Sequence, residues 1–269
     1  MITRLICSLL SLTLVAPVAA QLDIRGSTSA LPLMQDMARA YMQAHPEAGI
    51  RVSGGGSAAG LQALIAGETE IAMSSRFIER QEMQLATRQS VYPVPFELAH
   101  DAIVPVVHPR NPLRNLSRRQ IGLIYAGQIR NWAELGVDGG EISVICRDAN
   151  SGTRALWTRM ALRGRPAAAC SRTLASNLEV IQAVRDDPSA IGYIGMAHLS
   201  ASARVRPLSV EEQACTPECV RTGCYPLTRS LFLFSNGWPD REVLRFIRFT
   251  QRSAQARRII REAGLTPVH

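Results

Sequence analysis

Residues 22–44 read LDIRGSTSALPLMQDMARAYMQA, and this stretch indicates the fold. The short apolar run Leu22–Ile24 leads into the polar cluster Gly26–Ser29, and a helical pattern follows over Ala30–Ala44. The first turn of a helix carries free backbone N–H groups and partial positive charge, so a helix N-terminus is a natural anion site. The stretch therefore predicts a strand and a helix joined by an anion-binding turn.

Two further polar clusters follow the same pattern. Gly54–Ser57 follows the apolar run Ile50–Val52, Arg147–Thr153 follows Ile142–Ile145, and each cluster precedes a helical pattern. Glycines allow the backbone to approach a ligand closely, and Ser or Thr hydroxyls add hydrogen-bond donors. Three such turns and one arginine predict a site for a small tetrahedral oxyanion, which points to binding rather than to chemistry.

Strands alternate with helices along the chain, which favours an α/β architecture with mostly parallel sheets. The predicted strands are Leu22–Arg25, Ile50–Ser53, Ile71–Ser74, Val91–Phe96, Ile103–Val107, Ile142–Cys146, Ile191–Ile194 and Leu231–Phe234. The predicted helices are Ala30–Ala44, Ala58–Ala66, Glu79–Arg88, Ser117–Ala126, Arg154–Leu162, Leu178–Arg185 and a long C-terminal region from Asp240 to Ala263.

Two proline-containing segments suggest how the chain passes between two lobes. Val91–Phe96 holds two prolines, which disfavour a helix or a central strand and predict an extended crossover. Ala214–Pro226 could return the chain. One lobe is then residues 21–97 plus 226–269, and the other is residues 98–225. The first two polar clusters lie on one lobe and the third on the other, so the ligand is expected in the cleft between them.

The first twenty residues have the pattern of a secretory signal peptide. Arg4 gives a positive start, Leu5–Val15 is apolar, and Val18–Ala20 is a small-residue cleavage site. The apolar run is short for a transmembrane helix. Residues 1–20 are therefore predicted to be removed, leaving an exported chain that begins near Gln21.

All 30 basic residues are arginines, so chemistry that needs a lysine is excluded. The formal net charge is +8, but the arginines are scattered and aromatic residues make up only 5 % of the chain. This composition argues against a nucleic-acid partner. A positive field that attracts small anions is the preferred interpretation.

Five cysteines follow the signal segment, at positions Cys146, Cys170, Cys215, Cys219 and Cys224. In an oxidising compartment this number predicts at most two disulfides and one remaining thiol, with the pairing left open. The spacing of the last three is poor for a zinc ribbon and has no nearby histidine, so no metal site is predicted.

An ordered set of short motifs spans nearly the whole mature chain. The motifs are Gly26–Pro32, Gly55–Leu61, Ile71–Arg76, Asp101–Val104, Asn111–Leu113, Ile124–Trp132, Arg147–Arg154, Ile191–Tyr193 and Tyr225–Arg229. Together they resemble the periplasmic phosphate-binding proteins of ABC importers, which are two-lobed type II solute-binding proteins with a hinge. The resemblance implies capture of inorganic phosphate for import, a membrane permease as partner, no cofactor and no enzymatic activity. We expect a monomer.

The resemblance also implies a set of ligand contacts: Thr28, Ser29, Ser57 and Ser75 on one lobe, with Arg147, Ser151, Gly152 and Thr153 on the other. The chemistry of these residues agrees with that role. Arg147 can direct two N–H donors onto two oxygens and sets the sign of the site. Ser151–Thr153 fall at a helix N-cap and first turn, where N–H groups point outward.

One departure from the family pattern concerns proton recognition. Longer family members carry an aspartate where this chain has Ser75, and that carboxylate accepts the proton of hydrogenphosphate. Asp101 is the candidate for the missing acceptor, and a hinge or capping aspartate is the alternative. Arg76 is either a second anion contact or the partner of a nearby acid.

Two other functions remain open from the sequence. One is a binding protein for another oxyanion, such as molybdate or sulfate, and the other is a phosphate-sensing or scavenging module without a transporter. A hydrolase is disfavoured. Ser57 lacks the final glycine of a Gly-x-Ser-x-Gly turn, and His100 and Asp101 would point to opposite faces of a strand. No catalytic residue is predicted.

Overall fold

The computed structural model describes residues 21–138, 140–199 and 204–268. The predicted signal peptide, residues 1–20, lies outside the described residues. Within the described ranges, no helix combines the length and the apolar character needed to cross a membrane.

Strands and helices alternate through most of these ranges. The strands are β1 (Gln21–Gly26), β2 (Gly49–Gly55), β3 (Ile71–Ser74), β4 (Pro93–Val107), β5 (Asn115–Leu116), β6 (Ser143–Arg147), β7 (Cys170–Leu174), β8 (Ala190–Gly195), β9 (Arg206–Pro207), β10 (Ser209–Val210), β11 (Thr228–Asn236) and β12 (Thr266–Pro267). The α-helices are α1 (Leu31–Ala44), α2 (Ser57–Ile65), α3 (Arg80–Arg88), α4 (Arg118–Tyr125), α5 (Gly152–Met160), α6 (Asn177–Asp186), α7 (Pro217–Arg221), α8 (Arg241–Arg252) and α9 (Ala254–Glu262). The short 3₁₀ helices are η1 (Trp132–Leu135) and η2 (Met196–His198).

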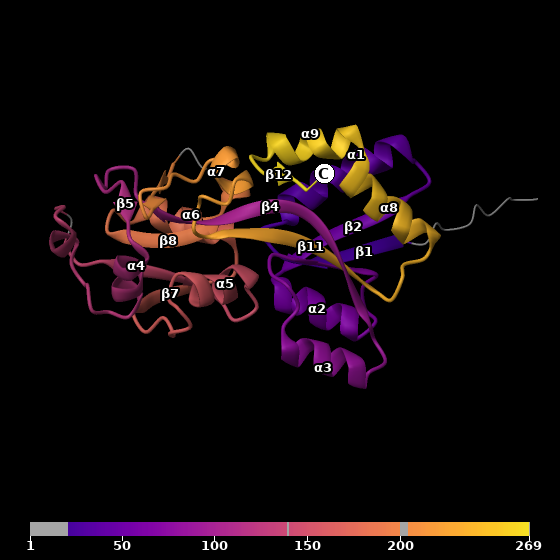
Figure 1. Cartoon of the computed structure of the whole chain (residues 1–269), viewed down its shortest axis with the longest axis horizontal. Helices are drawn as coiled ribbons and strands as arrows, with labels where there is room; N and C mark the ends of the chain where they lie inside the picture. The colour runs from indigo at the N-terminus through magenta and orange to yellow at the C-terminus, as the bar shows by residue number, and fades with distance from the viewer. Residues whose placement is uncertain (1–20, 139, 200–203, 269) are drawn as a thin grey trace, which may run out of the picture.

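Two lobes lie side by side and are joined by the long strands β4 and β11 (Figure 1). The strand order across both lobes is β2-β1-β3-β11-β4-β8-β6-β7. The pairs β1–β2, β1–β3, β6–β7 and β6–β8 are parallel, as predicted for an α/β fold. The pairs made by β4 and β11 are antiparallel, because these strands run between the lobes in opposite directions. The prediction of a two-lobed α/β fold with crossing strands is confirmed.

The first crossing is longer than the sequence suggested. The predicted strands Val91–Phe96 and Ile103–Val107 are the two ends of the single strand β4. Pro93 and Pro95 pair with β11, whereas β8 pairs with the other end of β4, so the prolines lie where the sheet does not continue. The chain returns through β11, which begins just after the predicted return segment.

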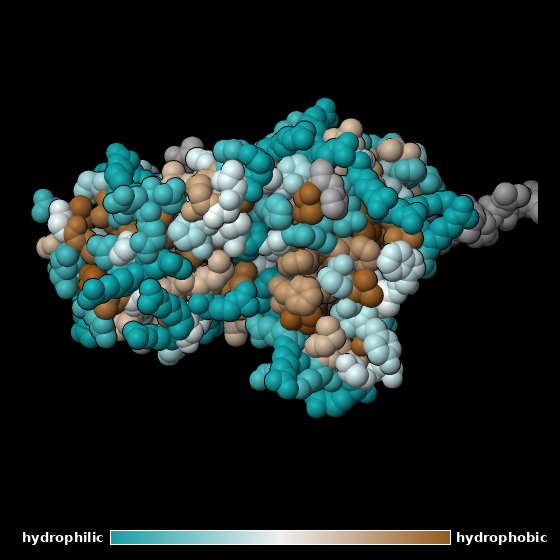
Figure 2. All heavy atoms as spheres, in the orientation of Figure 1, coloured by the Kyte–Doolittle hydropathy of each residue, from teal (hydrophilic) through white to brown (hydrophobic). Residues whose placement is uncertain are grey.

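In the first lobe, α1, α8 and α9 cover one face of the sheet, and α2 and α3 cover the other (Figure 1). Met34, Phe246 and Ile260 belong to the buried core under α1, α8 and α9. The predicted C-terminal helix divides at Ser253, whose hydroxyl accepts a hydrogen bond from the N–H of Ala256 and caps α9. Hydrophilic side chains cover α9 along the upper edge of the lobe (Figure 2).

In the second lobe, α6 packs on one side of the sheet through Val180 and Val184, and α4 and α5 pack on the other through Ile121 and Trp157. The cysteines form the disulfides Cys146–Cys170 and Cys219–Cys224 and leave Cys215 as a thiol, so the predicted number of disulfides is confirmed. Among the described residues, no group of His, Cys, Asp and Glu is arranged to hold a metal ion.

Candidate ligand-binding site

The first polar cluster forms the turn between β1 and α1. Gly26 has a φ of 141°, and a Cβ there would lie 2.1 Å from the carbonyl oxygen of Met73, so the turn requires a glycine. The N–H of Ser27 donates to the same carbonyl at 2.8 Å. This attachment to β3 fixes Thr28 and Ser29 at the end of the sheet, where both contact the second lobe.

The second cluster brings two hydroxyls together beside this turn. Ser57 begins α2, and Ser75 follows β3. The N–H of Ser75 donates to Ser57 Oγ at 3.0 Å, and the two Oγ atoms lie 3.3 Å apart. Both residues are buried. The hydroxyls that the sequence placed on separate turns therefore form one group.

Arg147 ends β6, and its side chain is buried at the junction of the lobes. Its Nη2 donates to the carbonyl of Ala175 at 2.7 Å and to Thr28 Oγ1 at 3.0 Å, and its Nε donates to the carbonyl of Leu174 at 3.2 Å. Its Nη1 is buried and has no hydrogen-bond partner in the described part of the chain. Burial lowers the pKa of Arg147, because the guanidinium loses water without gaining an ion-paired carboxylate there.

The third cluster continues into the first turn of α5. Ser151 caps the helix by accepting a hydrogen bond from the N–H of Arg154 at 3.2 Å. Gly152 and Thr153 follow, and the first N–H groups of a helix have no partner within it. A Cβ on Gly152 would lie 2.3 Å from Ser57 Oγ, so the start of α5 approaches the first lobe closely.

Contacts between the lobes connect the two sets of residues. Thr153 Oγ1 lies 3.0 Å from Ser29 Oγ. Asn177 Nδ2 lies 3.3 Å from Thr28 Oγ1 and 3.2 Å from Ser29 Oγ, and the amide is oriented by the N–H of Gly195, which donates to Asn177 Oδ1 at 3.1 Å. Asn177 was not predicted. It follows β7 at the start of α6, which is the same strand-to-helix pattern as the three clusters.

His198 lies behind the first turn and was also not predicted. Its Nε2 is 3.1 Å from the carbonyl oxygen of Thr28. Burial lowers the pKa of His198 to about 4, so the imidazole is neutral at neutral pH and its Nε2–H donates to that carbonyl. The histidine therefore supports the backbone of Thr28.

Asp101 lies on β4 beside the site, and both of its carboxylate oxygens are engaged. Oδ2 accepts a hydrogen bond from Arg229 Nε at 2.8 Å and lies 2.7 Å from Arg229 Nη2, and Oδ1 accepts from the N–H of Met196 at 3.0 Å. Both oxygens therefore contact groups of the protein itself. Arg229 in turn donates through Nη1 to Thr153 Oγ1 at 2.8 Å.

Arg76 follows Ser75 but points elsewhere. Its two terminal nitrogens lie 2.7 and 2.6 Å from the carboxylate oxygens of Glu82 on α3. Of the two roles that the sequence left open for Arg76, the geometry is that of a partner for an acid.

The structure thus brings the predicted ligand residues into one network at the junction of the lobes. Its members are Thr28, Ser29, Ser57, Ser75, Arg147, Ser151, Gly152 and Thr153, with Asp101 connected to it through Arg229. The residues that sequence reasoning did not place there are Asn177, His198 and Arg229.

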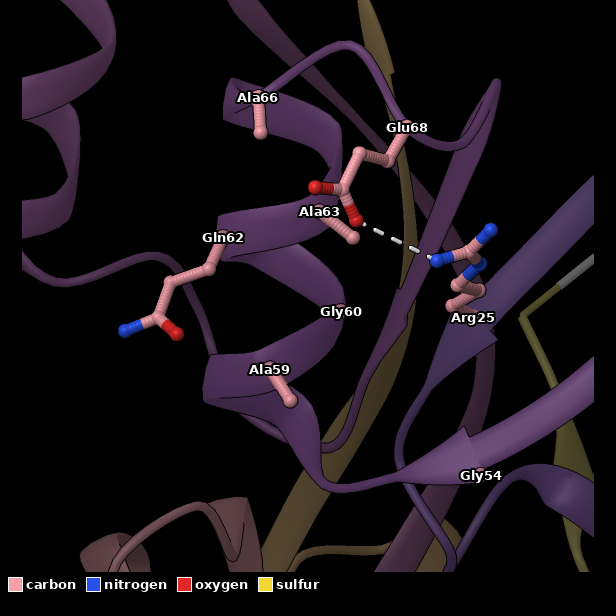
Figure 3. Close-up of a pocket in the computed structure, with 8 residues that line it drawn as sticks. All are labelled: Arg25, Gly54, Ala59, Gly60, Gln62, Ala63, Ala66 and Glu68. Carbon is pink, nitrogen blue, oxygen red and sulfur yellow. Dashed lines mark hydrogen bonds and ion pairs between the residues drawn. The ribbon is translucent and has the colours of Figure 1, made fainter.

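A surface pocket beside α2 has a different character (Figure 3). Arg25 faces it, but this guanidinium lies 3.4 Å from Glu68 and also pairs with Asp23. Its positive charge is therefore already balanced, whereas Arg147 at the junction of the lobes has no carboxylate partner among the described residues.

The two lobes and the donor-rich network between them define this molecule as a solute-binding protein. The chain belongs to the PBP superfamily, because the sequence profile of the PBP superfamily domain matches residues 13–253.

Individual relatives agree with this assignment. The chain is 28 % identical over 251 residues to the phosphate-binding protein PstS of Bacillus subtilis, covering 93 % of this chain and 81 % of the relative. A protein from Clostridium perfringens, assigned as a phosphate ABC transporter substrate-binding protein and solved with bound phosphate, matches with a TM-score of 0.85 and 29 % identity, covering 93 % of this chain and 100 % of that one. An ABC-type phosphate transport receptor from Vibrio cholerae matches with a TM-score of 0.73 and 31 % identity, covering 91 % and 99 %. The predicted family, and a binding protein rather than an enzyme, are confirmed.

Proposed function

We propose that this protein captures inorganic phosphate between its lobes for import by an ABC transporter. The observation that carries the proposal is the buried Arg147 guanidinium. Its Nη1 has no partner among the described residues, and its Nη2 donates across the junction of the lobes to the hydroxyl of Thr28. A buried cation without a carboxylate is costly unless an anion completes it. A tetrahedral oxyanion that accepts several hydrogen bonds meets this requirement.

The proposed ligand donors come from both lobes. The first lobe would supply the hydroxyls of Thr28, Ser29, Ser57 and Ser75, and the second lobe would supply Arg147, Asn177 and the first turn of α5 with Ser151, Gly152 and Thr153. Arg147 contributes the single full charge, and the remaining donors are neutral. An anion held mainly by neutral donors can be bound away from water and still be released, because few full charges have to be separated.

The proposed mechanism is a shift between open and closed arrangements of the lobes. Phosphate would contact both lobes only when they are closed, so it stabilises the closed arrangement by its differential affinity. We place the hinge in β4 and β11 and retain the lobes as residues 21–97 plus 226–269 and residues 98–225.

The relatives support the transport context. The names of the Bacillus subtilis, Clostridium perfringens and Vibrio cholerae proteins refer to phosphate, and the last two also refer to ABC-type transport. We extend this context to the present chain as an extracytoplasmic protein. We further propose that residues 1–20 are a signal peptide, that the protein is a monomer in the periplasm, and that a membrane permease is its partner.

Sulfate is a second candidate ligand because of one observation. Arg229 and Met196 make three contacts with the Asp101 carboxylate, so at most one of its acceptor positions is left for the proton of hydrogenphosphate. Serine and threonine hydroxyls can donate to either anion.

Calorimetric titration of the ligand-stripped protein tests the proposal. We expect saturable, one-site phosphate binding, and competition with sulfate and molybdate ranks the three oxyanions. Absence of phosphate binding, with or without binding of another oxyanion, would overturn the proposed function.

A further inference from the structure

The two strands that pass between the lobes carry a buried ion pair. Asp101 on β4 and Arg229 on β11 are directly opposite in the antiparallel register. Their side chains are 0 % and 2 % exposed. The pair therefore lies inside the hinge and not on its surface.

The same pair holds two segments of the second lobe. Arg229 Nη1 donates to Thr153 Oγ1 in the first turn of α5, and Asp101 Oδ1 accepts from the N–H of Met196 at the start of η2. Gly195 makes room for this arrangement, since a Cβ there would lie 2.8 Å from Arg229 Nη2 and 3.3 Å from Asp101 Oδ2. The hinge pair is thus connected to the element that supplies the anion site.

The contact with Thr153 fixes the direction of a hydroxyl proton. A hydroxyl has one hydrogen to donate, and Arg229, which is always protonated, can only act as a donor. Thr153 Oγ1 therefore accepts from Arg229, and its one hydrogen is donated either to Ser29 Oγ, which lies 3.0 Å away, or to a bound anion. Ser29 Oγ accepts from Asn177 Nδ2, so its hydrogen is also free to point into the cleft.

We infer that Arg229, held by Asp101, is a positioning residue for anion capture: by donating to Thr153 Oγ1 it orients the Thr153 and Ser29 hydroxyls so that this pair donates a hydrogen at the site. This inference rests on the proposed function, because it assigns a role toward the same anion. Asp101 balances the charge of Arg229, so Arg147 remains the cation that the anion meets.

The chain offers a matched control pair. Asp23 on β1 and Arg51 on β2 are also opposite each other in register, and Arg51 Nε donates to Asp23 Oδ1 at 2.9 Å. Asp23 is largely buried, and this pair lies outside the network of the cleft. The double variants Asp101→Asn with Arg229→Met and Asp23→Asn with Arg51→Met therefore each remove one Asp–Arg pair that joins neighbouring strands. The control pair is the more exposed of the two, and Arg25, which also contacts Asp23, keeps Glu68 as a partner.

Phosphate affinity and thermal unfolding are measured for each variant by calorimetry. The Asp101→Asn, Arg229→Met protein removes both charges of the hinge pair together, and we expect phosphate affinity to fall by about tenfold because Thr153 loses its charged donor. The control double variant is expected to retain the affinity of the wild type, whatever its loss in melting temperature. The single variant Asp101→Asn leaves the charge of Arg229 unbalanced near the anion, so we expect lower stability together with about threefold tighter phosphate binding.

These outcomes separate a positioning role from a structural one. If the pair only stabilised the fold, affinity would fall with stability in both Asp101 variants, and that result would overturn the inference. Phosphate binding by the Asp101→Asn, Arg229→Met protein at the wild-type level would also overturn it while leaving the proposed function intact. A wild-type protein that binds no phosphate would defeat both.

Discussion

Arg147 and Arg76 are both buried arginines, but they lie in opposite electrostatic surroundings. Arg76, at the corner between β3 and α3, makes two close contacts with the carboxylate of Glu82. Arg147, at the junction of the lobes, donates to carbonyl and hydroxyl oxygens and keeps a buried Nη1 without a partner among the described residues. The pKa of Arg147 is lowered by burial, whereas the pKa of Arg76 is raised, because its hydrogen bonds and charge interaction with Glu82 outweigh the opposing effect of burial.

The difference shows how a functional arginine can be distinguished from a structural one. A buried arginine that is paired with a carboxylate has its charge neutralised within the protein, and its removal should destabilise the fold. A buried arginine without a carboxylate partner can be neutralised by an anionic ligand, and its removal should weaken the binding of that ligand. Burial alone does not separate the two roles.

The largest effect is expected from Arg147→Gln. The amide cannot replace the charge or the paired donors, so phosphate affinity should fall by about a thousandfold, or roughly 4 kcal/mol. The free energy of unfolding without ligand should change little, because the substitution also removes an unbalanced buried charge. Calorimetric titration and denaturant unfolding measure the two quantities. Retained tight binding would contradict the assignment of Arg147.

The reverse pattern is expected for Arg76→Gln. Glu82 would lose its partner, and the free energy of unfolding should fall by about 3 kcal/mol. Phosphate affinity should stay within about twofold of the wild type, a difference of roughly 0.4 kcal/mol. Denaturant unfolding and titration of the same preparation provide the check. A loss of phosphate affinity comparable to that of Arg147→Gln would contradict the structural role of Arg76.

His198, which lies behind Thr28 at the junction of the lobes, makes the stability of this region depend on pH. Burial lowers the pKa of His198 from 6.5 to about 4 in the folded protein. As pH falls from about 6.5 to about 4, the unfolded chain gains a proton that the folded protein does not, so stability should fall by up to about 3 kcal/mol. Below pH 4 this contribution levels off. Denaturant unfolding across this range should show a smaller decline for His198→Gln; equal declines would contradict the shift.

A smaller effect is expected from Gly152→Ala, which tests how closely the lobes approach. The added Cβ would lie 2.3 Å from Ser57 Oγ and 2.8 Å from Ser75 Oγ, so the closed arrangement must open slightly. Phosphate affinity should fall by about tenfold, or 1.4 kcal/mol, with the ligand-free fold unchanged. Small-angle scattering with phosphate should report a less compact particle. Full affinity and closure would show that the lobes do not meet at this position.

The strand-to-helix clusters could be recognised from the sequence because their chemistry is local. Backbone geometry at the turns requires a glycine at Gly26 and Gly56 and favours a capping residue at Ser151. The apolar runs before these turns indicate strands. The family resemblance added Ser75. Local patterns therefore predicted which residues line the junction of the lobes, together with the α/β fold.

Residues whose role depends on tertiary pairing could not be recognised in this way. Arg229 reads as an ordinary strand residue until β11 pairs with β4 and places it opposite Asp101. Asn177 was missed together with β7, whose residues are half-buried or exposed, so the strand lacks an apolar run. His198 carries no local signal, because its role comes from packing against Thr28.

The most direct measurement is a crystal structure of the protein with phosphate added after ligand removal. We expect an ion between the lobes, with one oxygen about 3 Å from Arg147 Nη1 and others at the hydroxyls of Thr28 and Thr153. An ion bound elsewhere, or closed lobes with Arg147 paired to a carboxylate of the protein itself, would contradict this expectation.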